Sequence, residues 1–517
     1  MADLGRFREL VEQGYAFKGP HFQLGAAMLD GDVLAGSVVS IPLKTMNRHG
    51  LIAGATGTGK TKTLQMITEG LSRASVPVLV MDIKGDLSGI AAPGVLNEKI
   101  EERVRKIGAE GYRPEGFPVE LLSLSKEPGV RMRSTVSEFG PILLSKILGL
   151  NETQEGVVSM IFKYCDDERM PLIDLKDFIK VLQYIGNEGK KELEAHYGKI
   201  STTTTGTILR KVIELQQQGA DLFFGEPSFE VDDLTRIGPD GRGMINVLRV
   251  TDMQNRPKFF STFMLGLLAE IYAIFPEEGD MEQPKLVFFI DEAHLIFQEA
   301  TPALLQQIET VIKLIRSKGV GIFFCTQNPQ DIPAAVLGQL GLKVQHALRA
   351  FTAADRKTIK LAAQNYPESE FYKVEDLLTQ LGIGEALVTM LNEKGIPTPL
   401  VHTYLMPPST RMDVLTNEEI DRLVSSSSLA ARYGVDVDRE SAYEILTAKL
   451  EAAARQSADD TARRKTTDSG RPKAPESILD NTIVRQAGRT AATILTRSLL
   501  GALGLNTGRS RKKGLFG

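Results

Sequence analysis

Eight consecutive residues, Gly54 to Thr61, have the types and spacing needed to bind nucleotide phosphates. They read Gly-Ala-Thr-Gly-Thr-Gly-Lys-Thr and satisfy the G-x-x-x-x-G-K-[ST] pattern of a P-loop. Glycine lets the backbone turn sharply so that its N–H groups face an anion. Lys60 is expected to reach the β- and γ-phosphates, and the Thr61 hydroxyl to ligate magnesium. The predicted cofactors are ATP and Mg²⁺, and the predicted nucleotide-binding residues are Gly54, Ala55, Thr56, Gly57, Thr58, Gly59, Lys60, Thr61 and Lys62.

A second group capable of chemistry lies at the end of the apolar run Lys285–Ile290. Asp291 and Glu292 follow directly, which is the Walker-B arrangement. Asp291 is predicted to hold magnesium, and Glu292 to polarise the water that attacks the γ-phosphate. His294 has three interpretations: a structural residue at a helix start, a sensor of the γ-phosphate, or a partner of Glu292.

Amide and acidic side chains end two further apolar runs. Gln327 follows the run 319–326. If that strand lies between the P-loop strand and the Walker-B strand, Gln327 lies beside the γ-phosphate and can hydrogen-bond the attacking water. Asp82 and Asp86 follow the run 76–81. They are either ligands of magnesium-bound water or ordinary caps of a polar loop.

The elements that must position these residues alternate between short apolar runs and amphipathic segments, which predicts an α/β fold with a mainly parallel sheet. We expect the nucleotide site at the carboxyl ends of its strands. Residues 49–127 and 240–406 are assigned to this ATPase core, and 1–48 to a short strand-containing segment. Residues 128–239 read as a helical insertion, in which Ser201–Thr205 form either a helix cap or a phosphate-contacting loop.

Composition bounds the possible functions. The chain has 517 residues, a formal net charge of −4 and two cysteines, Cys165 and Cys325. Two widely spaced cysteines in apolar runs indicate buried thiols without a disulfide or metal framework. No apolar run approaches the ~18 residues of a membrane-spanning helix, and no signal-peptide core is apparent, so we expect a cytoplasmic protein. Any nucleic-acid role must rest on a local basic surface.

The C-terminal part changes in composition. Residues 407–455 are expected to form a helical extension, with a charged helix over 439–455, and 456–480 to be a disordered linker. Residues 481–517 carry basic side chains and an apolar stripe at helical spacing. This segment is interpreted either as a helix that docks on a partner, an acidic membrane surface or a nucleic-acid backbone, or as a solvated tail.

With these motifs in hand, the chain resembles the HerA/FtsK superfamily of P-loop motor ATPases, most closely the YjgR-like branch of HerA-type proteins. The resemblance covers about residues 20–410. It rests on runs of sequence around the P-loop, Asp82–Asp86, Lys285–His294, Arg316–Val320 with Thr326–Pro329, Val336–Gly341 and His346–Thr352.

The resemblance implies a RecA-like sheet with an additional strand next to the catalytic glutamate, and a ring, commonly a hexamer, that hydrolyses ATP between subunits. It also implies an arginine that completes a neighbour's site, here Arg316 with Arg349 in reserve. The load that it implies is DNA, moved by a translocase or helicase-like ring. Forty-eight residues leave little room for the N-terminal barrel of HerA proteins, so an ATP-driven switch acting on protein or membrane partners is the alternative.

Overall fold

The computed structural model describes residues 3–253, 256–279, 281–297 and 302–466, which divide into two compact units. One unit comprises residues 1–132 and 228–435, and the other residues 133–227 and 436–517. The first unit contains all the strands found among the described residues, and all the predicted catalytic residues. The second is helical in its described part.

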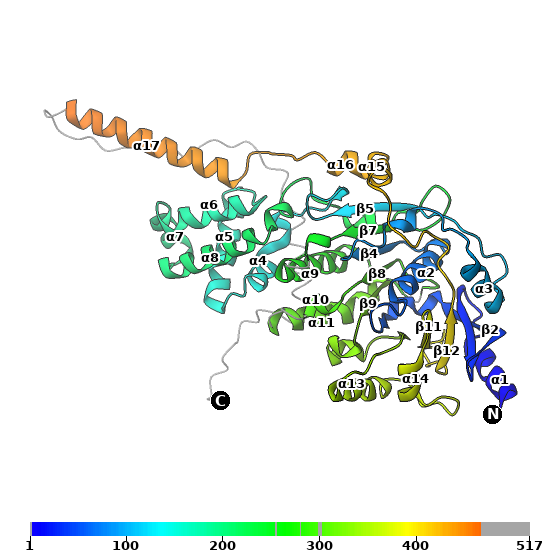
Figure 1. The fold of residues 1–517 in the computed structure, drawn as a ribbon. Helices are drawn as coiled ribbons and strands as arrows, with labels where there is room; N and C mark the ends of the chain where they lie inside the picture. Colours follow the sequence, from blue (N-terminus) through cyan, green and yellow to red (C-terminus); the bar gives the residue numbers. More distant parts are fainter. Residues whose placement is uncertain (1–2, 254–255, 280, 298–301, 467–517) are drawn as a thin grey trace, which may run out of the picture. The chain divides into compact units, whose positions relative to one another are not determined.

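The first unit is built on one sheet of twelve strands in the order β2-β1-β12-β11-β10-β3-β9-β8-β4-β7-β5-β6 (Figure 1). The strands are β1 His21–Leu29, β2 Asp32–Pro42, β3 Gly50–Ala53, β4 Val78–Asp82, β5 Val119–Ser123, β6 Val130–Arg131, β7 Ile245–Arg249, β8 Leu286–Ile290, β9 Val320–Thr326, β10 Leu342–Gln345, β11 Glu385–Met390 and β12 Val401–Leu405. All pairings from β10 to β6 are parallel, and those from β2 to β10 are antiparallel. The prediction of an α/β fold with a mainly parallel sheet is confirmed.

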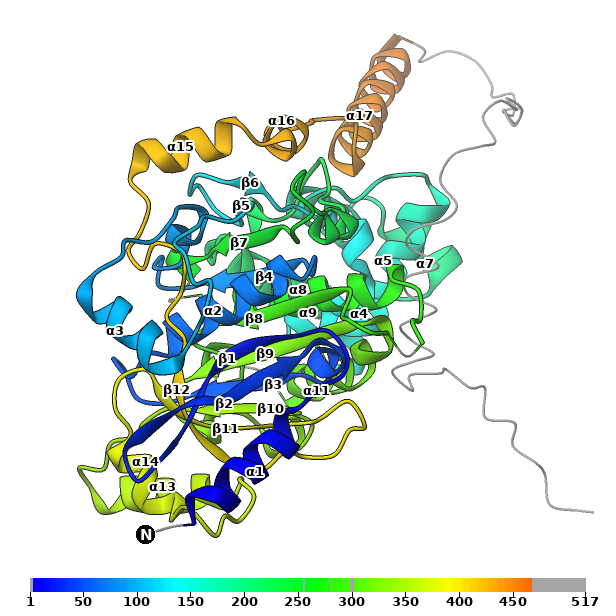
Figure 2. The same cartoon turned by 90° about the vertical axis from the view of Figure 1, so that its right-hand side faces the viewer.

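Strand β9 lies between the P-loop strand β3 and the Walker-B strand β8, as Figure 2 shows. Ala53 of β3 is in register with Thr326 of β9, and Phe324 of β9 with Ile290 of β8. The condition that the sequence set for Gln327 is therefore met, because the three strands end side by side at the same edge of the sheet.

Helices cover the two faces of the sheet. Phe289 of β8 packs in a cluster with Leu64 and Ile67 of α2. On the neighbouring strand, Phe324 packs against Phe297 of α10, with the rings tilted and their centroids 5.8 Å apart. The helices of this unit are α1 Leu4–Tyr15, α2 Lys60–Arg73, α3 Glu98–Ile107, α9 Pro257–Ile274, α10 His294–Phe297, α11 Pro302–Ile315, α12 Ala334–Leu337, α13 Ala353–Ala363, α14 Val374–Gln380, α15 Asn417–Ser425 and α16 Ser428–Tyr433.

The N-terminal segment belongs to this sheet. Strand β1 pairs with β2 on one side and with β12 on the other, so that Gly25 lies opposite Leu405. The antiparallel pair β11 and β12 encloses the turn at Asn392–Gly395. Residues 21–42 thus extend the central sheet by two strands.

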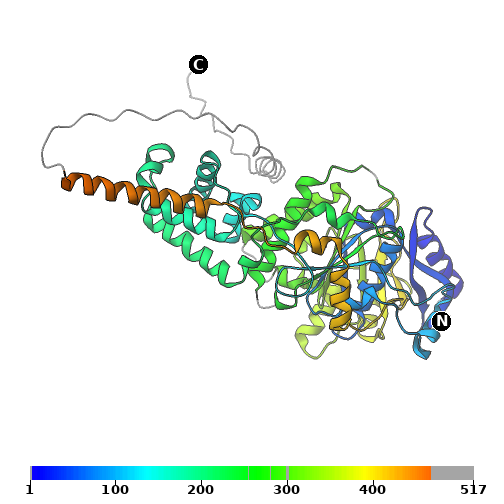
Figure 3. The same ribbon diagram turned by 90° about the horizontal axis from the view of Figure 1, so that it is seen from above.

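The second unit is a group of helices, seen from above in Figure 3. Its helices are α4 Val136–Ile147, α5 Glu152–Asp167, α6 Leu175–Gly186, α7 Lys190–Tyr197, α8 Thr202–Gln217 and α17 Ala442–Thr466. Ser201 caps α8 by accepting a hydrogen bond from the Thr203 N–H. The helix expected over 439–455 continues to Thr466, so the first part of the segment expected as a disordered linker is helical.

Helix α17 joins the second unit through its first turn. The hydroxyl of Ser441 and the N–H of Tyr443 both donate to the carboxylate of Asp177 in α6. The remainder of the predicted linker and the basic segment 481–517 lie outside the described residues. Among the residues that the structure describes, no helix has the length and apolar character required to cross a bilayer.

Candidate nucleotide site

The loop between β3 and α2 has the conformation of a phosphate cradle. Gly54, Gly57 and Gly59 have φ angles of 152°, 79° and 111°. A Cβ on Gly57 would meet no atom within 4 Å, so this residue faces open space. Helix α2 begins at Lys60, immediately after the loop. The loop N–H groups and the positive end of α2 therefore converge where an anion would bind.

Neighbouring strands hold the loop in place. The N–H of Gly54 donates to the Thr326 carbonyl at 3.2 Å, and that of Ala55 to the Ala347 carbonyl at 2.8 Å. On the other side the N–H of Gly384 donates to the Thr58 carbonyl at 3.1 Å. The cradle is thus fixed by backbone contacts from β9, from the chain after β10 and from the start of β11.

Lys60 lies over its own loop. Its ammonium donates to the carbonyls of Gly54 and Ala55, at 2.6 and 3.2 Å. Burial is the main cause that lowers the pKa of Lys60, and the nearby positive charge of Lys84 lowers it further. These carbonyls are weak partners for a cation compared with phosphate oxygens. The ammonium is therefore positioned to exchange them for the phosphates of a nucleotide.

Asp291 and Glu292 lie at the end of β8, both buried. Burial raises the pKa of Asp291 to about 7, and its Oδ2 atom makes no hydrogen bond within the described part of the chain. Glu292 adopts φ 46°, a left-handed conformation that is uncommon for a residue with a side chain. His294 Nδ1 lies 3.3 Å from Glu292 Oε2, which is the pairing that one interpretation of this histidine required.

Sequence reasoning did not assign a role to Lys84, whose ammonium forms an ion pair with Oε1 of Glu292. Lys84 lies in the loop after β4, and β4 is the neighbour of β8. The carboxylate of Asp82 holds this loop by accepting the N–H groups of Gly85, Asp86 and Leu87, at 2.7, 3.1 and 3.1 Å. Asp82 therefore acts as a loop cap in this structure. The available signal for Lys84 was its position, at the end of a strand predicted to reach the same edge as the P-loop.

Gln327 is exposed and comes directly after β9. Its neighbours are fixed, because Thr326 donates its hydroxyl to Asp331 at 2.6 Å and Asn328 caps the following turn. The structure thus presents Gln327 at the strand edge between Gly54 and Asp291. Thr61 follows Lys60 in the first turn of α2 and is half-buried. The ammonium of Lys62 donates to the Met412 carbonyl at 2.6 Å.

Arg316 lies at the opposite edge of the sheet from the P-loop of its own chain. It is exposed and precedes β9. Its charge contributes to lowering the pKa of His49, which stands just before β3 and is mainly affected by burial. Strand β9 has seven residues, so about 20 Å separates its two ends. Arg316 is therefore too far from the P-loop of its own chain to contact a nucleotide bound there. Arg349 is exposed and follows β10 at the edge that carries the P-loop.

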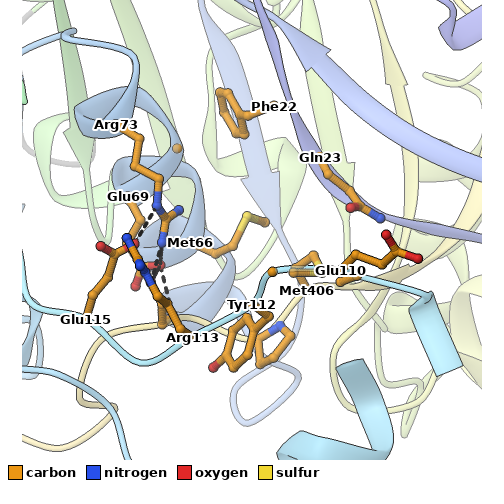
Figure 4. Close-up of a pocket in the computed structure, with 15 residues that line it drawn as sticks. Phe22, Gln23, Met66, Glu69, Arg73, Glu110, Tyr112, Arg113, Glu115 and Met406 are labelled. Carbon is orange, nitrogen blue, oxygen red and sulfur yellow. Dashed lines mark hydrogen bonds and ion pairs between the residues drawn. The ribbon is translucent and has the colours of Figure 1, made fainter. Parts of the chain in front are cut away.

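A pocket of about 390 Å³ lies beside the second half of α2, away from the phosphate loop (Figure 4). Phe22, Met66 and Met406 form part of its wall. Arg73 in this pocket is paired with Glu115, at 2.8 Å. Since its charge is already neutralised, Arg73 offers little attraction to an anionic ligand. None of its lining residues belongs to Gly54–Thr61, so the pocket is separate from the nucleotide site.

The segment after β12 is bound along α2. Glu69 of α2 is buried, and its carboxylate accepts hydrogen bonds from the N–H and hydroxyl groups of Ser409 and Thr410. One turn earlier, Gln65 donates to the hydroxyl of Thr410 and to the carbonyl of Arg411. Together with Lys62, these side chains hold residues 409–412, which we call the strap, against the P-loop helix.

The residues present fit a nucleotide and a divalent cation. The loop leaves open space at Gly57, and the Lys60 ammonium contacts only backbone carbonyls of the loop. The buried Oδ2 of Asp291 has no hydrogen-bond partner among the described residues. An oxygen ligand of this kind suits Mg²⁺. This combination is what a P-loop site requires of the protein before its ligand binds.

Comparison with known proteins decides the family. A family described as helicase HerA-like, C-terminal, matches residues 29–512. The chain belongs to this HerA-like family. Two curated relatives are DNA double-strand break repair helicases HerA. That of Sulfolobus acidocaldarius is 22% identical over 380 residues, which is 71% of this chain and 68% of the relative. That of Saccharolobus solfataricus is 21% identical over 378 residues, 69% of this chain and 66% of the relative.

The HerA-like chain thus spans about two thirds of these relatives. Among solved structures it is similar to the bacterial conjugative coupling protein TrwB. The trigonal form in complex with sulphate gives a TM-score of 0.50 at 13% identity, covering 79% of this chain and 94% of that one. This likeness concerns the fold. TrwB has also been solved with ADP and Mg²⁺, with a TM-score of 0.48, 14% identity and coverage of 78% of this chain and all (100%) of TrwB.

Proposed function

We propose that this HerA-like protein hydrolyses ATP with Mg²⁺ and uses the energy to move along DNA, as a ring of identical chains. The observation that carries the proposal is the meeting of Lys60, Asp291 and Gln327 at the carboxyl ends of β3, β8 and β9. Membership of the HerA-like family supports an NTPase. The names of the two helicase relatives support DNA as the load. We also assign the chain to the YjgR-like branch, on its runs around the P-loop and Lys285–His294.

Each residue has a role in this proposal. Gly54–Gly59 bind the phosphates through backbone N–H groups, and Lys60 contributes a positive charge. Thr61 and Asp291 would hold Mg²⁺, which when bound supplies charge neutralisation at the phosphates. Glu292 accepts the proton of the attacking water, and Gln327 orients that water. Arg316 of one chain completes the site of the next chain around a ring, which is expected to be a hexamer by family resemblance.

The test is steady-state ATP hydrolysis by the full chain, with and without linear duplex DNA, at two salt concentrations. Glu292→Gln is the control for contaminating activity. We expect turnover that exceeds this control and rises with DNA at low salt, because phosphate contacts weaken steeply with salt. If neither duplex nor single-stranded DNA changes the rate of ATP hydrolysis, the result would contradict the DNA motor and favour a protein or membrane load. Turnover equal to that of the control would contradict the ATPase itself.

A further inference from the structure

Lys84 occupies a position that the proposed hydrolysis does not explain. Its ammonium contacts Oε1 of Glu292, while Oε2 of the same carboxylate faces His294. Oε1 is therefore in an ion pair, whereas Oε2 lies near the imidazole without accepting a hydrogen bond from the described residues. A water molecule that approaches Oε1 must compete with the Lys84 ammonium for that oxygen.

The two partners differ in their freedom to move. The side chain of Glu292 is 7% exposed, whereas that of Lys84 is 37% exposed. The backbone beneath Lys84 is fixed, because Asp82 accepts three N–H groups of the loop. The more exposed lysine side chain is therefore the partner with room to move. A change of its side-chain rotamers is enough to separate the pair.

The surroundings of Lys84 offer it a second partner. Its charge is near enough to Lys60 to lower the pKa of that residue, and Lys60 lies on the phosphate loop. Polyphosphate drawn to Lys60 also attracts Lys84, since both ammoniums act on the same region. The terminal phosphate then competes with Glu292 for one cation.

We propose that Lys84 is a switch residue shared between Glu292 and the terminal phosphate of a nucleoside triphosphate. Without nucleotide it neutralises Glu292 and keeps the base occupied. When a triphosphate binds, Lys84 transfers to the phosphate and Glu292 becomes available to water. The switch rests on the proposed ATPase function and deepens it, because it makes the base available only when there is a γ-phosphate to cleave.

The test is a double-mutant cycle on affinity, which requires no turnover. Dissociation constants for the non-hydrolysable analogue ADPNP with Mg²⁺ are measured by calorimetry for the wild type, Glu292→Gln, Lys84→Met and the double variant. Releasing Lys84 by Glu292→Gln should tighten ADPNP binding on the order of tenfold, the size of a modest charge-pair coupling. In the Lys84→Met background the same change should alter affinity by less than about twofold.

Two controls sharpen the result. ADP lacks the terminal phosphate, so its affinity should show no coupling between the two positions. Lys84→Arg keeps the positive charge and should retain the coupling. If Lys84→Met unfolds at a lower temperature than the wild type, Lys84→Gln is used in its place. If Glu292→Gln tightens ADPNP binding equally with Lys84 present and in the Lys84→Met background, the switch is overturned. That result is expected when the change only removes the repulsion between the Glu292 carboxylate and the phosphates. Loss of ADPNP binding by the wild type would instead contradict the proposed ATPase function.

Discussion

The hydroxyl of Thr63, in the P-loop helix, lies 2.9 Å from Nε2 of His346, which directly follows strand β10. Both side chains are buried, and burial lowers the pKa of the histidine to about 3. The imidazole is therefore neutral at physiological pH. A Cβ on Gly54 would come within 2.5 Å of the His346 Cβ. His346 thus packs against the phosphate loop at Gly54, and its contact with Thr63 links the P-loop helix to β10.

Replacing His346 by alanine should weaken nucleotide binding. The change leaves the buried Thr63 hydroxyl without this partner, which typically costs ~1–3 kcal/mol, and removes the contact behind Gly54. We expect a lower unfolding temperature and roughly tenfold weaker binding of Mg·ADP, measured by scanning fluorimetry and calorimetry. Thr63→Val is the matched control that removes the same hydrogen bond while keeping the imidazole. Wild-type affinity in His346→Ala would show that the loop does not depend on this support.

Stability should fall as pH rises when no divalent cation is present. Burial raises the pKa of Asp82 to about 6 and that of Asp291 to about 7, from 3.8. These two carboxyls therefore bind more protons in the folded chain than in the unfolded chain between about pH 4 and 7. The buried His49 and His346 bind fewer protons in the folded chain below about pH 6.5 and oppose this effect there. In EDTA the unfolding temperature should therefore drop from about pH 6.5 to pH 8, where the titration of Asp291 dominates.

Two comparisons identify the groups responsible for that dependence. Asp291→Asn should flatten the upper part of the profile, near pH 7, because the amide does not titrate. Saturating Mg·ADP should also flatten it, since a bound cation favours the ionised carboxylate. An unfolding temperature that rises across this same pH interval in EDTA would contradict the assignment.

Arg316 should act on a neighbouring chain. Arg316→Ala is expected to reduce kcat by 10³-fold or more, the scale of a trans arginine, with little change in KM. Its own P-loop remains intact. Mixing it with an excess of Lys60→Ala, which keeps Arg316 but loses tight nucleotide binding, should therefore restore hydrolysis in part. Arg349→Ala, mixed in the same way, tests the alternative residue. No recovery in either mixture would contradict completion of the site in trans by these arginines.

The motifs could be located from sequence because each is local. The glycines before Lys60 and the acidic pair after Ile290 follow short apolar runs, and such runs end at one edge of a parallel sheet. The place of β9 between β3 and β8 was left as a condition, because parallel crossover topology permits that order without requiring it. The pairing of β1 with β12 could not be predicted in this way, because it joins residues such as Gly25 and Leu405 that are distant in sequence.

The side-chain contacts could not be predicted from the sequence either. The pairing of Lys84 with Glu292 depends on β4 being the neighbour of β8, and that of His346 with Thr63 on β10 being the neighbour of β3. Neither neighbour relation follows from a local pattern. The helix predicted from the sequence ended at residue 455, whereas α17 continues to Thr466. The polar composition of 456–466 had suggested a linker. That stretch closely follows the alanine run Ala452–Ala454 and includes glutamine, alanine, arginine and lysine, which favour helix even without an apolar face.

The strap at residues 409–412 has a mechanical consequence. It is bound to the P-loop helix at three successive places, by Lys62, Gln65 and Glu69, and it continues into α15. A tension applied to the chain beyond the strap is therefore delivered to the helix that carries the phosphate loop, without passing through the sheet. In the other direction, a displacement of that helix would pull on the part of the chain that follows the strap.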